Sequence, residues 1–418
     1  MKILFLTIGI PQLGEKGSGG FYADMIQELA HQGHEVTAIA PALPFQETKV
    51  YQEGKIRVLR VKLLPIIGNL PTYKKIIGVL MMNPRYKRAY KKYLQGEKFD
   101  WVLMPTPPSS LVDVVEYIQK KSEAKFYIIL RDIHPESKRR FPTHETLQRT
   151  DVYDECKKPY SAGKMMYSYL YKKSQRGYKK ADLIGCMSPG NIDFVKQIAP
   201  YVDDKKVVLL PNWYSESPLV EYDKKSIREK YGLTGKFVAI FGGTIGEGQA
   251  VWNIATLAKK YLNNPDVVFL IVGRGVKMAV LEEMASTDEL TNMKFLNYMP
   301  REEYEGLLNT ADLGIITIDE KFPVPTCPSK VIGYMALHQP VIAMINKGSD
   351  YGEFYIDKPG CGLWSAGLDN EKMFSNFDWL YTHPEERKRM GEAGYKYYKE
   401  HFSVKVIAEE LEKQLLNG

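Results

Sequence analysis

The sequence predicts an α/β protein built from two doubly wound, Rossmann-like domains. At 418 residues the chain exceeds what a single hydrophobic core usually supports. Short apolar runs typical of strands alternate with helical patterns, and a second such series starts afresh at Phe237. Continuous apolar strands between helices are typical of parallel sheets covered on both faces. Such sheets bind ligands at the carboxyl ends of their strands, so we expect a cleft shared by the two domains.

The apolar runs give the expected strand positions. The first run, residues 2–8, is followed by a glycine-rich segment at 14–20 and then by a helical pattern. The other strands expected in the first domain are 35–40, 56–61, 101–104, 126–130 and 183–186. Those expected in the second domain are 237–243, 267–272, 294–296, 313–317 and 341–343.

Composition marks the domain boundaries. Residues 209–222 are rich in Pro, Ser and Asn and suit an interdomain linker. We therefore expect an N-terminal domain at 1–208 and a C-terminal domain at 223–384. The segment 385–418 is helical in pattern with a break near Phe402, and we expect it to pack back on the first domain.

Composition also restricts the class of protein. The chain is 44% apolar and 26% charged, and no stretch reaches the roughly 18–20 apolar residues of a membrane span. The apolar N-terminal run is short, ends at Pro11 and lacks a small-residue cleavage site, so we interpret it as a buried strand. The four cysteines lie far apart, which fits neither a zinc site nor a disulfide framework. These features favour a cytoplasmic protein.

Two glycine-rich loops are candidate phosphate sites. Residues 17–20 lie between the first strand and the first helix, where bare backbone amides can face an anion. A tight turn that needs glycine for its dihedral angles explains these residues equally well. Gly243 and Thr244 stand in the equivalent place in the second domain. The spacing matches neither the dinucleotide fingerprint nor a P-loop.

Two basic residues of the second domain also suit a diphosphate. Arg274 ends a strand, where its guanidinium can reach a phosphate, although a solvated loop arginine is the alternative. Ser329 and Lys330 begin a helical pattern, where a hydroxyl, an ammonium and free amides suit the same ligand. A plain N-cap serine followed by a solvated lysine is the alternative for this pair.

Six short motifs follow one another along the chain. Each motif alone is a weak signal, but their order is specific. They are 17–41 (GSGGFYADMIQELAHQGHEVTAIAP), 131–137 (RDIHPES), 211–213 (PNW), 241–249 (FGGTIGEGQ), 271–275 (IVGRG) and 328–343 (PSKVIGYMALHQPVIA). On these motifs the chain resembles the retaining glycosyltransferases of family 4, which have the B fold (GT-B). The resemblance is greatest to bacterial enzymes that build surface polysaccharides and to the L-fucosamine transferase type, and it covers nearly the full length.

The resemblance implies a nucleotide diphosphate-sugar donor held mainly by the second domain. The diphosphate would lie between the glycines of the first domain and the Ser329–Lys330 turn, and the base near Asn297 and Tyr298. No metal ion and no further cofactor are implied, because basic side chains and helix amides neutralise the diphosphate. The sequence accordingly has no Asp-x-Asp triplet. The donor-binding residues implied are Gly19, Gly20, Gly243, Thr244, Asn297, Tyr298 and Ser329.

The resemblance also implies how the reaction proceeds. In this family the leaving phosphate helps to accept the proton of the incoming hydroxyl, so catalysis is mostly positioning and leaving-group stabilisation. Lys330 and Arg274 become catalytic residues, because charge grows on the diphosphate. Asp132 and His134 follow the fifth strand, where relatives keep residues near the reacting sugar. A capped turn at Asp132, with His134 merely preceding a proline, is the alternative.

The chain departs from the family at the donor ribose. Relatives carry two Glu residues separated by seven positions, and the second contacts the ribose, but here the positions hold Pro325 and Gly333. Either ribose recognition differs or Asp319 or Glu320 substitutes. Glu247 stands where relatives often have a basic residue. These departures leave open a catalytically silent homologue that binds a nucleotide sugar or stabilises a partner transferase.

A basic and apolar segment favours contact with a membrane surface. Residues 62–92 mix Lys and Arg with apolar side chains and contain no acidic residue, and 157–180 is a second basic stretch. Each basic residue near anionic lipid contributes about 1 kcal/mol. The alternative is an ordinary amphipathic element of the first domain's core, and nucleic acid is a weaker interpretation because no binding motif accompanies the charge.

The sequence thus predicts a metal-independent, retaining glycosyltransferase at the inner face of the cell membrane, with a polyprenyl diphosphate-linked sugar as acceptor in surface-polysaccharide assembly. It leaves open the donor sugar, the choice between uracil and guanine, the acceptor's identity, the linkage and the oligomeric state.

Overall fold

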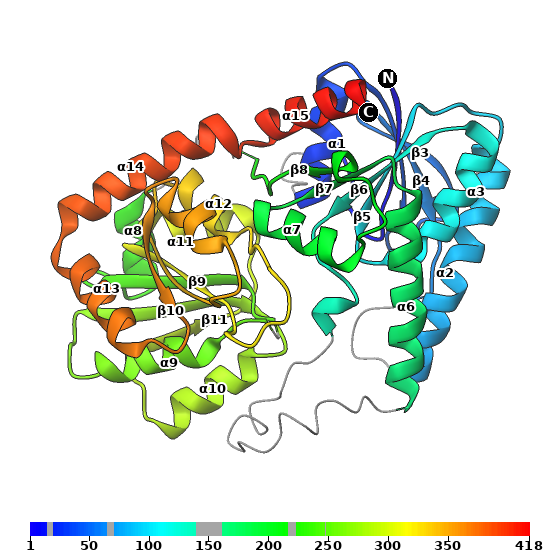
Figure 1. Cartoon of the computed structure of the whole chain (residues 1–418). Coiled ribbons are helices and arrows are strands. Elements are labelled where there is room, and N and C mark those ends of the chain that lie inside the picture. Colours follow the sequence, from blue (N-terminus) through cyan, green and yellow to red (C-terminus); the bar gives the residue numbers. More distant parts are fainter. Residues whose placement is uncertain (15–19, 65–70, 139–160, 216–222, 247) are drawn as a thin grey trace. The chain divides into compact units, whose positions relative to one another are not determined.

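The computed structural model describes residues 1–14, 20–64, 71–138, 161–215, 223–246 and 248–418 (Figure 1). The chain divides into two compact units. Unit 1 contains the described parts of 1–138 and 161–211 together with Ile407–Gly418, and unit 2 contains the described residues of 212–406. The division after Pro211 falls inside the segment in which we expect the interdomain linker.

Unit 1 is built on an eight-stranded sheet of order β3-β4-β2-β1-β5-β6-β7-β8. All neighbouring strands pair in parallel except β3 and β4, which are antiparallel. Every residue of β5 and β7 is buried, as expected for strands covered on both faces. The strands are β1 (Lys2–Leu6), β2 (Glu35–Pro41), β3 (Lys49–Glu53), β4 (Ile56–Val61), β5 (Trp101–Thr106), β6 (Lys125–Leu130), β7 (Leu183–Cys186) and β8 (Val207–Leu209).

Helices cover both faces of this sheet. α2 (Thr72–Tyr93), α3 (Val112–Ser122) and α6 (Ser161–Lys180) follow one another along one side, and α1 (Phe21–His31) lies on the other (Figure 1). α7 (Pro189–Ile198) begins with proline, and the side chain of its N-cap residue Ser188 accepts a hydrogen bond from the Asn191 amide. Short 3₁₀ turns lie at Ser109–Leu111, Glu136–Lys138 and Asp204–Lys206.

Unit 2 contains a six-stranded, fully parallel sheet of order β11-β10-β9-β12-β13-β14. One face packs on α9, α10 and α13 in a continuous apolar core. The strands are β9 (Phe237–Thr244), β10 (Val267–Arg274), β11 (Met293–Leu296), β12 (Leu313–Thr317), β13 (Val341–Ile345) and β14 (Gly362–Ala366). The helices are α8 (Lys224–Lys230), α9 (Val251–Lys260), α10 (Met278–Thr287), α11 (Arg301–Thr310), α12 (Lys330–Ala336), α13 (Asn370–Thr382) and α14 (Pro384–His401), with one π-helical turn at Glu353–Asp357.

The two units confirm the predicted pair of doubly wound α/β domains. The sheet order of unit 2 reverses direction between β9 and β12, so the carboxyl ends of these strands flank a topological switch point. The loops after β9, β10 and β12 therefore lie where ligands of such sheets bind. Gly243 and Thr244 are the last residues of β9, Arg274 is the last residue of β10, and Ser329 and Lys330 lie at the start of α12, which follows β12.

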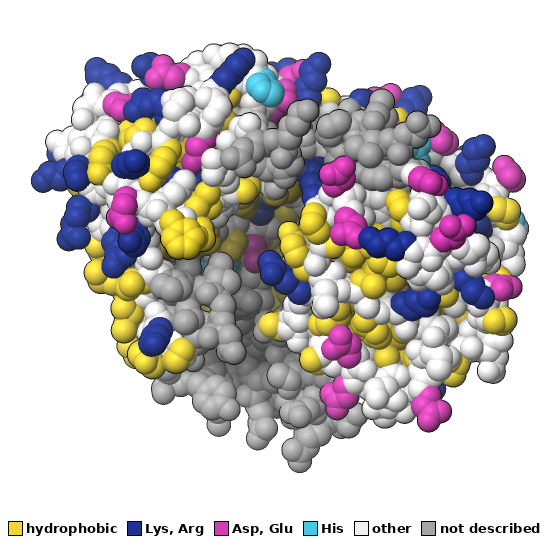
Figure 2. Space-filling view, turned by 180° about the vertical axis from the view of Figure 1, so that it is seen from behind, with side chains coloured by type: hydrophobic (Ala, Val, Ile, Leu, Met, Phe, Trp, Pro, Cys, Tyr) yellow, Lys and Arg dark blue, Asp and Glu magenta, His cyan; other side chains and the backbone are white. Residues whose placement is uncertain are grey.

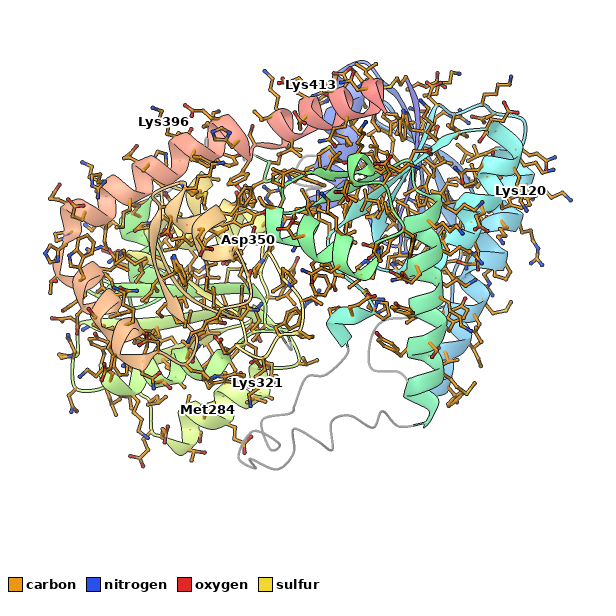
Figure 3. The ribbon with its side chains drawn as sticks, viewed as in Figure 1. Lys120, Met284, Lys321, Asp350, Lys396 and Lys413 are labelled. Carbon is orange, nitrogen blue, oxygen red and sulfur yellow. The ribbon has the colours of Figure 1, made fainter. Side chains whose placement is uncertain are left out.

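The C-terminal helices α14 and α15 (Val404–Asn417) are separated at Phe402, where the sequence predicts a break. The end of α15 packs on the sheet of unit 1, since the indole nitrogen of Trp101 donates to the Leu415 carbonyl (3.1 Å) and the Tyr127 hydroxyl donates to Gln414 (2.6 Å). Figure 3 shows Lys413 pointing away from α15. α15 thus buries one face and exposes basic residues on the other.

Candidate active site

Glycines shape the ends of strands β9 and β10 in unit 2. Gly243 has φ 92°, a left-handed conformation that favours glycine. A Cβ on Gly273 would lie only 2.0 Å from the Gly243 carbonyl oxygen, so the paired strand ends can meet only through glycine. Gly243 and Thr244 are exposed at this edge. Close approach of the two strand ends therefore accounts for these glycines, and the same strand ends expose backbone where we predict a phosphate.

Lys330 reaches across this strand end. Its ammonium nitrogen donates to the Thr244 carbonyl oxygen (2.9 Å) and to Gln249 Oε1 (3.1 Å), and it lies 4.5 Å from the centre of the Phe241 ring. Although the side chain as a whole is only partly buried, these groups enclose its ammonium end. Burial lowers the pKa of Lys330 from its usual value to about 7. Both acceptors named here are neutral, so the site favours an added anion.

Lys330 is hydrogen-bonded within unit 2 and is not simply solvated. Ser329 occupies the N-cap position of α12, but its exposed side chain makes no capping hydrogen bond. The hydroxyl is therefore not used as a conventional cap. The segment before it is fixed from the PNW motif, because the side-chain amide of buried Asn212 donates to the Cys327 carbonyl oxygen (2.7 Å). This bond ties the PNW motif to the segment just before PSK.

Arg274 and Tyr298 come together at the ends of β10 and β11. The guanidinium carbon of Arg274 lies 4.5 Å from the centre of the Tyr298 ring. Both side chains are exposed, as is Asn297, and Tyr298 keeps 64% of its surface. An exposed aromatic ring beside a guanidinium suits a nucleotide, because a base can stack on such a surface and a phosphate can pair with the arginine.

Gly333 has an aromatic neighbour in place of the missing carboxylate. A Cβ on Gly333 would lie 3.3 Å from Cε2 of Tyr214, so the ring occupies the space into which a side chain at 333 would extend. The Tyr214 hydroxyl donates to Glu305, which is 1% exposed and also accepts from Arg301. Sequence reasoning missed Tyr214, since its contact with Gly333 spans more than a hundred residues.

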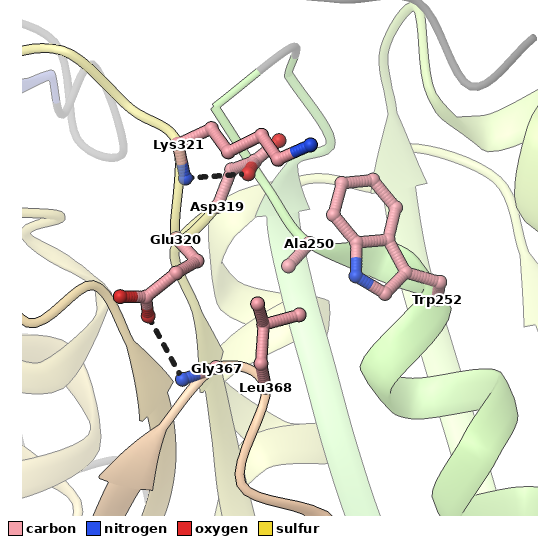
Figure 4. Close-up of a pocket in the computed structure, with 7 residues that line it drawn as sticks. All are labelled: Ala250, Trp252, Asp319, Glu320, Lys321, Gly367 and Leu368. Carbon is pink, nitrogen blue, oxygen red and sulfur yellow. Dashed lines mark hydrogen bonds between the residues drawn. The ribbon is translucent and has the colours of Figure 1, made fainter. Parts of the chain in front are cut away.

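Asp319 and Glu320, the suggested substitutes for the missing pair, line a pocket with Trp252 and Leu368 (Figure 4). Glu320 is already engaged, because its carboxylate accepts from the backbone amides of Lys347 (3.3 Å) and Gly367 (3.2 Å). Glu247 lies outside the described residues. Within the part of the chain that is described, no group of three His, Cys, Asp or Glu residues is placed to hold a metal ion.

Within unit 1, the predicted residues Asp132 and His134 lie in the loop after β6. Both are half-buried, and the His134 amide donates to the Asp132 carbonyl oxygen (2.8 Å). Tyr22, at the start of α1, is near enough to feel the charges of both Arg131 and Asp132. Burial raises the pKa of Tyr22 to about 12, while Arg131 lowers this pKa and Asp132 raises it. The loop and the start of α1 thus form one polar cluster.

Arg131 fixes this cluster. Its guanidinium donates to the carbonyl oxygens of Leu210 (2.9 Å) and Pro211 (3.3 Å) and lies 5.8 Å from the Phe21 ring. Its role was not predicted, although it is the first residue of the RDIHPES motif. The amide of Gly20, expected to face a phosphate, donates instead to Asp24 Oδ1 (3.2 Å). Gly19 lies outside the described residues.

Comparison with known proteins identifies the class. Residues 223–397 match the family described as "Glycosyl transferases group 1". The chain is 22% identical over 292 residues to the probable glycosyltransferase WbjE of Pseudomonas aeruginosa, across 69% of this chain and 68% of that protein. It is 25% identical over 172 residues to the putative colanic acid biosynthesis glycosyl transferase WcaI of Escherichia coli K12, across 40% of this chain and 42% of that protein.

Solved structures agree on the fold. Sucrose-phosphate synthase from Thermosynechococcus elongatus superposes with a TM-score of 0.74 at 15% identity, over 100% of this chain and 99% of that one. Anabaena Alr3699/HepE, in complex with UDP and glucose, superposes with a TM-score of 0.68 at 13% identity, over the whole of both chains. The fold is that of the GT-B glycosyltransferases. The chain is a glycosyltransferase, and its residues 223–397 match the group 1 family.

Proposed function

We propose that this glycosyltransferase transfers a sugar, with retention of configuration, from a nucleotide diphosphate-sugar to a lipid-linked sugar at the cytoplasmic face of the membrane, in surface-polysaccharide biosynthesis. The similarity to WcaI, named for colanic acid biosynthesis, supports the pathway class. The fold shared with HepE, solved with UDP and glucose, supports a nucleotide-sugar donor. The family 4 resemblance supports retention.

Lys330 is the observation that carries the proposal. Its ammonium is enclosed beside the open backbone of Gly243 and Thr244, with a depressed pKa. An ammonium in this state gains more from an arriving diphosphate than a solvated lysine does, because its present partners are weak and water is partly excluded. Arg274 lies at the end of the neighbouring strand and adds a second positive charge. Two such cations suit a diphosphate without a metal ion.

The proposed step is balanced without any further reactant. The bond between the anomeric carbon and the diphosphate oxygen breaks, and the acceptor hydroxyl oxygen bonds to the same face of that carbon. The hydroxyl proton passes to the leaving diphosphate, whose growing charge Lys330 and Arg274 stabilise. Asp132 and His134 would orient the acceptor hydroxyl and the reacting sugar.

The surface of α2 supports contact with a membrane. Its inner face is core, but Tyr73, Ile77, Leu80 and Met81 are exposed at 39–59% of their surface beside the basic residues of the same helix. Figure 2 shows basic and hydrophobic side chains mixed along the left edge of the view. No described helix is both long and apolar enough to span a bilayer. The apolar outer surface exceeds what the core alone requires, which favours shallow insertion.

The test is release of nucleoside diphosphate from a panel of UDP- and GDP-sugars, with polyprenyl diphosphate-sugar acceptors and a chelator present. We expect turnover with at least one donor. Lys330→Ala should lower kcat by about 10²–10³-fold, the usual cost of removing one charge-stabilising donor. Lys396→Ala is the matched control, since Lys396 is exposed on α14 (Figure 3) and should leave kcat unchanged.

The second candidate is a catalytically silent homologue, favoured by the tyrosine ring beside Gly333. This candidate predicts binding of a nucleotide sugar without its consumption. Turnover by the purified protein that is lost in Lys330→Ala would contradict it. Absence of turnover with every donor and acceptor, together with unchanged biological function of Lys330→Ala, would contradict the transferase proposal.

A further inference from the structure

Unit 2 contains a pocket outside the proposed diphosphate site. It has a volume of about 370 Å³ and is lined by Ala250, Trp252, Asp319, Glu320, Lys321, Gly367 and Leu368. Figure 4 shows the Trp252 indole extending from α9 toward Asp319 and Lys321 across the pocket, with Leu368 below. This volume is near the lower end of the roughly 300–1,000 Å³ of small-molecule sites, so it suits a ligand of one ring.

Asp319 is the unusual residue of this pocket. Only 2% of its surface is exposed, and one carboxylate oxygen accepts from the Lys321 amide (2.9 Å). The other oxygen, Oδ2, is buried and makes no hydrogen bond to any described residue. A buried carboxylate oxygen without a donor is costly, and burial raises the pKa of this group. Oδ2 is closed to solvent in this conformation, so a ligand hydroxyl can donate to it, and remove that cost, only when the carboxylate turns toward the pocket.

The charges around Asp319 favour a neutral ligand. Lys321 and Lys277 both act on the carboxylate as nearby positive charges, while Glu320 acts as a negative one. Two acids facing two bases leave no strong net charge to attract an ion. A neutral molecule that carries hydroxyl groups and one apolar face fits this balance.

We propose that this pocket is a second carbohydrate-binding subsite that takes one neutral pyranose ring. The apolar C–H face of the ring packs on the Trp252 indole and on Leu368, and a ring hydroxyl donates to Asp319 Oδ2 once the carboxylate has turned toward the pocket. An aromatic platform beside a buried acceptor supplies both the apolar area and the polar contact that a sugar requires. The subsite would hold a sugar unit of a glycan other than the sugar being transferred, and it does not depend on the proposed reaction.

The pocket is separated from the diphosphate site by the loop that follows β9. Gln249 accepts from Lys330 on one side of this loop, whereas the next residue, Ala250, lines the pocket. The Asp319 amide donates to the Gly248 carbonyl oxygen (3.0 Å), which ties the pocket to the same loop. Lys330 and Arg274 do not line the pocket. The two sites are therefore neighbours that separate variants can distinguish.

The experiment is saturation-transfer NMR on the full chain with the methyl glycosides of glucose, galactose, mannose, N-acetylglucosamine and fucose, followed by titration of those that bind. Asp319→Asn keeps the shape but replaces the charged acceptor, and Trp252→Ala removes the platform. Leu368→Arg obstructs the pocket at a side chain that is 69% exposed, so it should not affect folding. Lys330→Ala is the control for binding at the donor site.

We expect at least one glycoside to bind, with affinity reduced tenfold or more in Trp252→Ala and Leu368→Arg, and unchanged in Lys330→Ala. If Asp319→Asn fails to fold, Leu368→Arg decides the result. No saturation transfer to any glycoside would overturn the proposal. Binding that survives Leu368→Arg, or that is lost in Lys330→Ala alone, would overturn it as well, because the sugar would then occupy another site.

Discussion

The enclosed ammonium of Lys330 predicts that donor affinity depends on pH. With a pKa of about 7, Lys330 is about nine-tenths protonated at pH 6 and about one-tenth protonated at pH 8 in the free protein. A bound diphosphate favours the protonated form, so the donor must bring a proton with it at high pH. The dissociation constant of the nucleotide sugar should therefore rise about tenfold between pH 6 and pH 8.

Isothermal titration calorimetry without acceptor, repeated in buffers of different ionisation enthalpy, measures both the affinity and the protons taken up. We expect uptake of about 0.9 proton per donor at pH 8 and about 0.1 at pH 6. The nucleotide-sugar diphosphate has no group that titrates in this range. Lys330→Arg is the control, because arginine stays charged and should give a flat profile. A flat wild-type profile, or the same slope in Lys330→Arg, would refute the reasoning.

Three further predictions test separate parts of the chain. Gly273→Ala should lower the free energy of unfolding in urea by about 1–3 kcal/mol or more, because the new Cβ would overlap the Gly243 carbonyl, and unchanged stability would contradict the close approach. Glu53→Gln should lower the free energy of unfolding by about 3–5 kcal/mol, because it leaves the fully buried Arg60 guanidinium without its ion-pair partner. Thermal unfolding measures this loss, and a loss below about 1 kcal/mol would contradict the prediction. Leu80→Asp, at a side chain 53% exposed, should weaken sedimentation with anionic vesicles while stability changes by less than about 0.5 kcal/mol, and unaltered vesicle binding would count against the proposed membrane surface.

The sequence predicted the buried strands well because burial on both faces produces continuous apolar runs. β5, β6, β9 and β12 lie within one or two residues of the predicted ranges. β3, β8 and β14 were missed. β3 is an antiparallel edge strand in which only one residue is buried. β8 and β14 are also edge strands, with one buried residue in β8 and two in β14. Half-exposed edge strands carry a weak apolar signal, so their existence is decided by pairing with distant segments.

The site could be predicted where residues that carry the relevant chemistry are neighbours in the sequence. Ser329 and Lys330 follow each other in sequence, and the chemistry of both is visible locally. The groups that enclose Lys330 come from elsewhere, however, because Phe241, Thr244 and Gln249 lie more than eighty residues earlier. The depressed pKa of Lys330 is a product of that packing. No local sequence pattern around Lys330 predicts this lowering of its pKa.

Gly333 stands where the family resemblance implies a ribose-binding glutamate, and the Tyr214 ring lies in the space that such a side chain would enter. A glutamate at 333 would extend toward the Tyr214 ring, which Glu305 fixes in place through the hydroxyl. Glu305 is itself buried and paired with Arg301, so the ring cannot turn away without breaking that network. A side chain at 333 therefore requires the Tyr214 ring to move by a few tenths of an ångström, against the network that holds it. In the proposed function, the nucleotide is recognised by groups that remain exposed, among them Arg274 and Tyr298, whose side chains stack at the end of the sheet.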